Sequence, residues 1–126
     1  MADFNNLTMN LCLVTLLWSL AAVETGHDDA AIGRAGERSQ YQIMEVVWRQ
    51  HEPSLPHDRC HGQAATDVAT QHLHWLTKQV GSDVISLASA WNQGATGHKR
   101  RGPNDYARRV SALYASRIAQ GRDIGY

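Results

Sequence analysis

The stretch that decides the fold is LCLVTLLWSLAAVETG, residues 11–26. Its large apolar side chains recur at steps of three and four residues, the spacing that places them on one face of an α-helix. These side chains are Leu13, Leu16, Leu17, Leu20 and Val23. Gly26 follows as a C-terminal stop. The pattern predicts a helix from about Leu7 to Thr25 whose apolar stripe packs against a core.

The same stretch has features of a secretory signal peptide, because the apolar run ends in the small residues of 19–22. Such a signal needs a positively charged start, and residues 1–10 contain Asp3 but no Lys or Arg. The run is also shorter than the roughly 20 apolar residues that cross a bilayer. We therefore expect a buried or amphipathic first helix and no stable membrane span, with a signal peptide as the alternative.

Length and charge limit the classes of protein that fit. The chain has 126 residues, enough for one domain over 1–126, with a core of about 12–118 and flexible tails at 1–10 and 122–126. Twelve Lys and Arg balance twelve Asp and Glu, so the overall field steers little and we expect no nucleic-acid partner. A core of this size needs neither metal nor disulfide. Cys12 and Cys60 are expected to be free thiols.

The later sequence predicts four more helices, bounded by Pro, Gly or a capping residue, over about 44–51, 63–80, 84–93 and 105–120. Trp48 and Trp75 are assigned to the core. Residues 95–103, which contain Lys99-Arg100-Arg101, are predicted to form a basic loop.

Residues 31–43, called the wing below, show glycines and no helical stripe, which predicts a small β-hairpin or ordered loop. The fold class is therefore mainly α, an α+β arrangement in which a compact helical domain carries a small wing after its first helix.

Glu24 interrupts the apolar stripe of the first helix. It follows Leu20 by four residues, so its carboxylate projects from the edge of the buried face. Partial desolvation and the negative end of the helix dipole both disfavour the charged form and raise the pKa of a carboxyl group there. A carboxyl group with a raised pKa can act as a general acid near neutral pH. The alternative is a helix-end Glu whose side chain turns into water.

Four segments occur in a fixed order: 22–26 (AVETG), 36–43 (GERSQYQI), 87–94 (LASAWNQG) and 106–110 (YARRV). Together they resemble the lysozyme-like superfamily, specifically the transglycosylase SLT-type domains of lytic transglycosylases, which are similar to goose-type lysozymes. In that family a helix ends in a catalytic Glu, a glycine-rich wing ends in Gln-Ile or Gln-Val, and Ala-Tyr-Asn-x-Gly and Tyr-x-x-x-Val motifs follow. Two places depart from it. Residues 39–42 are Ser-Gln-Tyr-Gln where Gly-Leu-Met-Gln is usual, and Trp91 replaces the Tyr.

The resemblance implies cleavage of the β-1,4 bond between MurNAc and GlcNAc in peptidoglycan, with Glu24 as general acid and base and no cofactor. A lytic transglycosylase needs one carboxylate, whereas a muramidase asks for a second, for which Glu37 is the candidate. The other candidate substrate-binding residues are Gln42, Tyr41, Trp91, Asn92 and Tyr106. Such a substrate implies a periplasmic or extracellular location, although residues 1–10 give no convincing export signal.

Each of these assignments has a structural alternative. Gln42 and Asn92 also suit a role in locking the wing against the helices, and Glu37 suits a pair with Arg34 or Arg38. Histidines and Cys60 gather between residues 57 and 74, but their spacing matches no standard zinc site, so no metal is expected. A non-catalytic lysozyme-like domain, either glycan-binding or structural and phage-associated, is the second function class.

Overall fold

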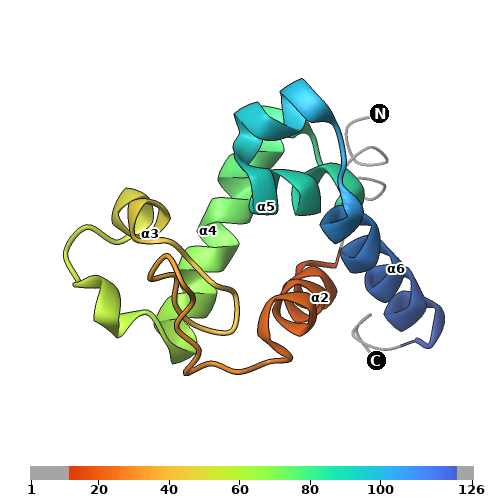
Figure 1. The fold of residues 1–126 in the computed structure, drawn as a ribbon. Coiled ribbons are helices and arrows are strands. Elements are labelled where there is room, and N and C mark those ends of the chain that lie inside the picture. The colour runs from red at the N-terminus through yellow and green to blue at the C-terminus, as the bar shows by residue number, and fades with distance from the viewer. Residues whose placement is uncertain (1–11, 122–126) are drawn as a thin grey trace, which may run out of the picture.

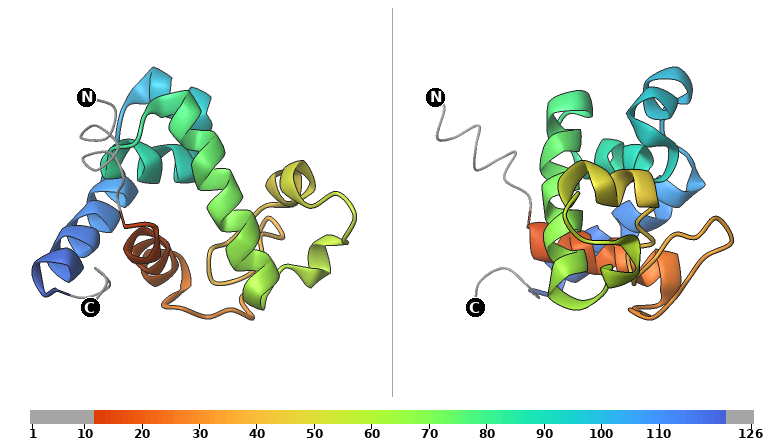
Figure 2. Two further views of the ribbon diagram at one scale, coloured as in Figure 1. Left: turned by 180° about the vertical axis from the view of Figure 1, so that it is seen from behind. Right: turned by 90° about the vertical axis from the view of Figure 1, so that its left-hand side faces the viewer.

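The computed structural model describes residues 12–121. Five α-helices and one 3₁₀ helix cover most of this part of the chain: α2 (Leu13–Thr25), α3 (Glu45–His51), η1 (His57–Arg59), α4 (Gly62–Val80), α5 (Val84–Arg101) and α6 (Asp105–Ala119). In Figure 1, α4 runs diagonally, with α3 and the wing on one side and α5 and α6 on the other. Figure 2 shows α4 along the back of the molecule, with α2 beside α6. The predicted start of the first helix at Leu7 and the predicted tails lie outside the described residues.

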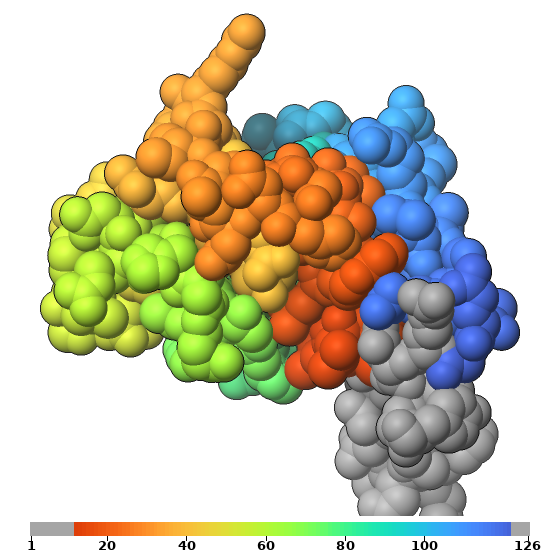
Figure 3. Space-filling model, turned by 90° about the horizontal axis from the view of Figure 1, so that it is seen from below, coloured from red at the N-terminus to blue at the C-terminus, as the bar shows by residue number. Residues whose placement is uncertain are grey.

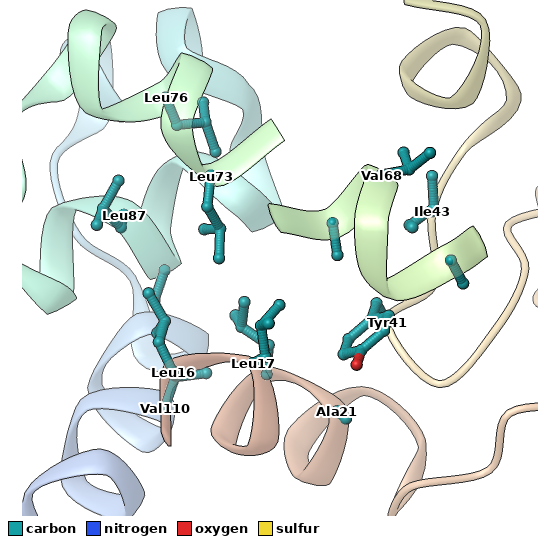
Figure 4. Packing of buried hydrophobic residues seen from close by; sticks show 14 of the residues in the cluster. Leu16, Leu17, Ala21, Tyr41, Ile43, Val68, Leu73, Leu76, Leu87 and Val110 are labelled. Atoms are coloured by element: carbon teal, nitrogen blue, oxygen red, sulfur yellow. The ribbon is translucent and has the colours of Figure 1, made fainter. Parts of the chain in front are cut away.

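The core forms where α2, α4, α5 and α6 meet. Figure 4 shows their leucine and valine side chains pointing toward one another. The fully buried members include Leu16, Leu20, Leu73, Leu76, Leu87 and Val110. The predicted stripe of the first helix is confirmed, because Leu16, Leu17 and Leu20 are buried and Leu13 and Val23 pack at its edge. Burial of each such side chain stabilises the fold by about 1.5–3 kcal/mol.

The two tryptophans assigned to the core behave differently. Trp48 is fully buried, as predicted, and its Nε1 donates a hydrogen bond of 2.8 Å to the carbonyl of Leu55. The prediction for Trp75 is wrong, because 38% of this residue is exposed. Leu73 and Leu76 occupy the buried face of α4 instead, and the Trp75 ring lies at the surface, stacked on His72 at 5.4 Å between ring centroids.

The wing is not the predicted β-hairpin. Within the described part of the chain it contains only two isolated antiparallel bridges, Ile32 with Arg38 and Arg38 with Ile43. Ser39 and Gln42 have left-handed φ values of 77° and 55°, which are incompatible with a continuous strand. The wing is therefore an ordered loop, which was the other half of the prediction.

The end of α5 also differs from the prediction. Residues 95–101 were expected to be a loop, but the helix resumes after a kink at Gly94, whose φ is 80°. Hydrogen bonds join the two sides of the kink: the Oγ of Ser89 lies 2.8 Å from Nδ1 of His98, and Arg101 donates to Gln93 at 2.8 Å. These contacts favour a second helical segment that carries the basic residues.

Candidate functional site

Glu24 lies in the last turn of α2, at the boundary between the helices and the segment that leads to the wing. The helix ends there because Gly26 adopts a left-handed φ of 65° and donates its N–H to the carbonyl of Ala22. The half-buried carboxylate of Glu24 accepts a hydrogen bond of 2.7 Å from the hydroxyl of Tyr106 on α6. Seen from below, the end of α2 lies between the projecting wing and the start of α6 (Figure 3).

The pKa of Glu24 is raised, in the direction that its position in the sequence predicts. Burial of the carboxyl group is the largest cause. The hydrogen bond from Tyr106 favours the charged form and acts against burial, whereas the negative charge of Glu37 acts with it. The neutral carboxylic acid of Glu24 therefore persists to higher pH than in water, which suits donation of a proton to a substrate.

Tyr106 is positioned by the first turn of α6. The side chain of Asn104 caps this helix by accepting the N–H of Ala107 at 3.0 Å, and the fully buried Val110 fixes how the helix is rotated. Burial, followed by the charge of Glu24, raises the pKa of the Tyr106 hydroxyl, so it remains a donor at all ordinary pH values. The sequence suggested a sugar contact for this residue, but its hydroxyl is used on Glu24.

Gln42 holds the wing together. Its Nε2 donates to the carbonyl of Ser39 at 2.9 Å and to that of Ala31 at 3.3 Å, so both amide protons are used within the wing. These bonds lie within the wing and do not join it to a helix, which is the role that the sequence suggested beside a sugar contact. Gly33 lies under this side chain, and any Cβ there would collide with the carboxylate of Glu37 and with Oε1 of Gln42.

Glu37 has a partner that the sequence did not indicate. Its Oε1 accepts the backbone N–H of Ala35 at 2.9 Å, which closes the turn at the tip of the wing. Ion pairs with Arg34 or Arg38 do not form. The carboxylate is thus tied to the wing, yet close enough to Glu24 to influence its pKa.

The departures from the family pattern contact each other. Nε1 of Trp91, on α5, donates to the carbonyl of Tyr41 in the wing at 3.3 Å. Tyr41 is only 6% exposed, and its hydroxyl lies 3.0 Å from that of Thr66, so its ring packs beneath the wing instead of facing a substrate. Asn92 is exposed and accepts a 2.8 Å hydrogen bond from Asn104, which ties the start of α6 to α5.

A family model described as the Transglycosylase SLT domain matches residues 4–113. The chain belongs to the transglycosylase SLT family. The resemblance inferred from the four segments is confirmed, and the family is in general one of glycan-cleaving lytic transglycosylases that act on peptidoglycan. No curated protein and no solved structure matches the chain. Among residues 12–121, no helix is both long and apolar enough to span a membrane.

Two further contacts anchor the wing of this SLT domain, and sequence analysis missed both. The hydroxyl of Thr25 donates to the carbonyl of Gln40 at 3.1 Å, and the Oδ2 of Asp29 accepts the N–H of Gly62, the first residue of α4, at 2.6 Å. Asp29 and Gly62 are 33 residues apart, so no local pattern could have indicated this contact.

A histidine pair, also missed, connects α3 and α4 of the SLT domain. Nε2 of His51 lies 3.0 Å from Nδ1 of His72, and the His72 ring also meets Trp91 edge-on at 5.6 Å. Burial lowers the pKa of both imidazoles, that of His72 to about 4. The pair is neutral at pH 7 and acts as a polar joint between the two helices.

Other candidates for a site in the described part of the domain would be a metal centre, a disulfide or a cavity. Across residues 12–121, no three His, Cys, Asp or Glu side chains are arranged to hold a metal ion. Cys12 and Cys60 form no disulfide with each other. A cavity of about 310 Å³ lies between the wing and residues 58–61, and Glu24 does not line it.

Proposed function

We propose that this SLT domain cleaves the β-1,4 bond between MurNAc and GlcNAc of peptidoglycan as a lytic transglycosylase, with Glu24 as the catalytic residue. The observation that carries the proposal is the half-buried Glu24 carboxyl group, whose pKa is raised and whose orientation is set by the Tyr106 hydroxyl at 2.7 Å. A single oriented carboxyl group with a raised pKa is what this reaction needs from the protein.

In the first step, the carboxylic acid of Glu24 gives its proton to the glycosidic oxygen as the bond to C1 of MurNAc breaks. The substrate's N-acetyl group assists from the opposite side. The Glu24 carboxylate then takes the proton of the C6 hydroxyl, and the C6 oxygen forms the new bond to C1. The product is a 1,6-anhydro sugar, no water is consumed, and Glu24 returns to its acid form.

Two contacts support this scheme, and the first of them favours it over hydrolysis. Glu37, the candidate second carboxylate, is already used by the backbone N–H of Ala35, where it closes the wing turn. Tyr106 donates to the Glu24 carboxylate and so stabilises the charged form that appears after proton transfer. In this scheme Tyr106 is a positioning residue, and Glu37 acts on Glu24 only through its charge.

The test is incubation of the chain and its Glu24→Gln variant with purified peptidoglycan, followed by mass spectrometry of the soluble products. We expect anhydro-muropeptides from the parent and a loss of about 10²–10⁴-fold in the variant. Tyr106→Phe is the companion variant. It removes a donor to the carboxylate, so the pH at which activity is lost on the alkaline side moves upward while the fold is kept.

Each other outcome has a defined meaning. Products with a reducing end from the parent would make the chain a muramidase and bring Glu37 into the reaction. Equal product release by the parent and by Glu24→Gln would exclude Glu24 as the catalytic residue. No release by a folded parent would leave the non-catalytic interpretation, in which the domain binds glycan or is part of a larger assembly.

A further inference from the structure

The neutral total charge of the chain conceals a strong separation of charge along it. Residues 98–121 contain six Lys or Arg and a single Asp, a formal charge of +5. Residues 12–97 contain five Lys or Arg and nine Asp or Glu, a formal charge of −4. The expectation that the overall field steers little therefore does not hold for the C-terminal part of the domain.

The cations of this region are exposed side chains at the end of α5 and in the first half of α6. We call this set the cationic surface, and its members are Lys99, Arg100, Arg101, Arg108 and Arg109. Asp105, the one acidic residue nearby, pairs with Arg108 at 2.8 Å, and both side chains are largely exposed. Exposed pairs of this kind are weak, so most of the positive charge stays available to a ligand.

The cationic surface adjoins the reactive carboxyl group. Arg109 follows Tyr106 by one helical turn, so the two side chains lie on neighbouring positions of the same face of α6. Burial and then Glu24 raise the pKa of Tyr106, and the charge of Arg109 acts against them, which is consistent with that closeness. The Asn104–Asn92 hydrogen bond ties the start of α6 to α5. Arg109 therefore lies one helical turn from the residue that donates to Glu24.

We propose that the cationic surface, centred on Arg109, binds the carboxylates of the peptide stems carried by the glycan strand. This inference rests on the proposed function. Each MurNAc bears a peptide on its lactyl group, so cleavage at MurNAc brings a stem with free carboxylates next to Glu24. Arginine is well suited to such a ligand, because its guanidinium group pairs with carboxylates through two parallel hydrogen bonds. Phosphate polymers are the alternative anionic ligand, but they have no fixed position relative to the bond that is cleaved.

The experiment compares two substrates, peptide-bearing glycan strands freed of phosphate polymers and the same strands after enzymatic removal of the peptides. The test variant is Arg100→Gln/Arg109→Gln. The matched control is Arg59→Gln/Lys78→Gln, which removes the same charge from exposed positions of η1 and α4. We expect the parent and the control to prefer peptide-bearing strands. In the test variant this preference falls about fivefold.

Binding separates this inference from the proposed function. Sedimentation of the Glu24→Gln protein with insoluble peptidoglycan needs no cleavage, and added salt or the two Arg substitutions should release it. If the parent cleaves neither substrate, the proposed function fails, and sedimentation alone decides the role of the cationic surface.

Several results would overturn the inference. They are a parent without preference for peptide-bearing strands, an equal loss on both substrates, and an equal effect of the control variant. Sedimentation that depends on Arg100 and Arg109 only while phosphate polymers remain attached would assign the surface to those polymers instead.

Discussion

The helical core and the wing are stabilised in different ways. The core is built from fully buried apolar side chains such as Leu20 and Leu73, which contribute through area and shape. The wing has two isolated bridges and relies on single hydrogen bonds, above all those of Gln42 and Asp29. Glu24 lies where the two regions meet. Its orientation depends on the core through Tyr106, whereas its charge environment depends on the wing through Glu37.

Removing apolar volume from the core should have the largest effect on stability. Leu20→Ala deletes a fully buried side chain of the helix that carries Glu24. We expect the free energy of unfolding to fall by about 3 kcal/mol, from lost burial and the cavity left behind. Denaturant titration followed by circular dichroism measures this, with the exposed Val14→Ala on the same helix as control. A loss below that of the control would show that the core is not the main source of stability.

The pair of His51 and His72 lies at a second place where the core and the wing meet, because α3 follows the wing directly. The pKa of His72 is about 4 in the folded chain, against 6.5 for an exposed histidine. The unfolded chain therefore binds more protons between these values, so the stability contributed by neutral His72 is present above pH 6.5 and is lost as the pH falls toward 4.

We expect His72→Gln to reduce this acid destabilisation by about 2 kcal/mol between pH 7 and 4. Chemical denaturation at a series of pH values measures the slope for the parent and the variant. His74→Gln, on the exposed side of the same helix, serves as control. Identical slopes for the parent and His72→Gln would mean that His72 is solvated and that its bond to His51 contributes little.

The contrast between core and wing also explains what the sequence could predict. The helices follow from local patterns, namely apolar spacing, the Asp83 and Asn104 caps and the glycine stops, and most bounds agree within a residue or two. Glu24 was singled out because it interrupts such a pattern, and the direction of its pKa shift agrees with that position. The wing and the His51–His72 pair depend on contacts between residues 11 to 50 positions apart, which leave no periodic signal. The region after Gly94 was misjudged for another reason, because the hydrogen bonds that join the two sides of its kink link residues eight and nine positions apart without any apolar period.

A change confined to the wing should be smaller and local. Gln42→Ala removes two hydrogen bonds inside the wing, and we expect the wing to lose about 1–2 kcal/mol of stability. Hydrogen exchange of backbone amides measures where this loss occurs. Amides of residues 31–43 should exchange faster, while those of α4 and α5 stay as protected as in the parent. Gln71→Ala, at an exposed position of α4, is the control. Faster exchange throughout the molecule would mean that the wing and core unfold as one unit.

The smallest expected effect concerns the backbone at Ser39, where the family usually has Gly. Ser39 has a φ of 77°, which costs a residue with a Cβ about 1 kcal/mol relative to Gly. Its Oγ accepts the N–H of Tyr41 at 3.1 Å, a hydrogen bond of about the same worth. Ser39→Gly removes both the strain and the hydrogen bond, so we expect its free energy of unfolding to change by no more than about 0.5 kcal/mol. Ser39→Ala loses the hydrogen bond but keeps the strain, so its free energy of unfolding should fall by about 1 kcal/mol. The glycine variant would then be more stable than the alanine variant, the reverse of the order found in helices.

Denaturant titration of both variants decides the matter, since an alanine variant more stable than the glycine variant would contradict a left-handed backbone at this position. If the expected order is observed, the hydrogen bond of the serine hydroxyl offsets the backbone strain at this position.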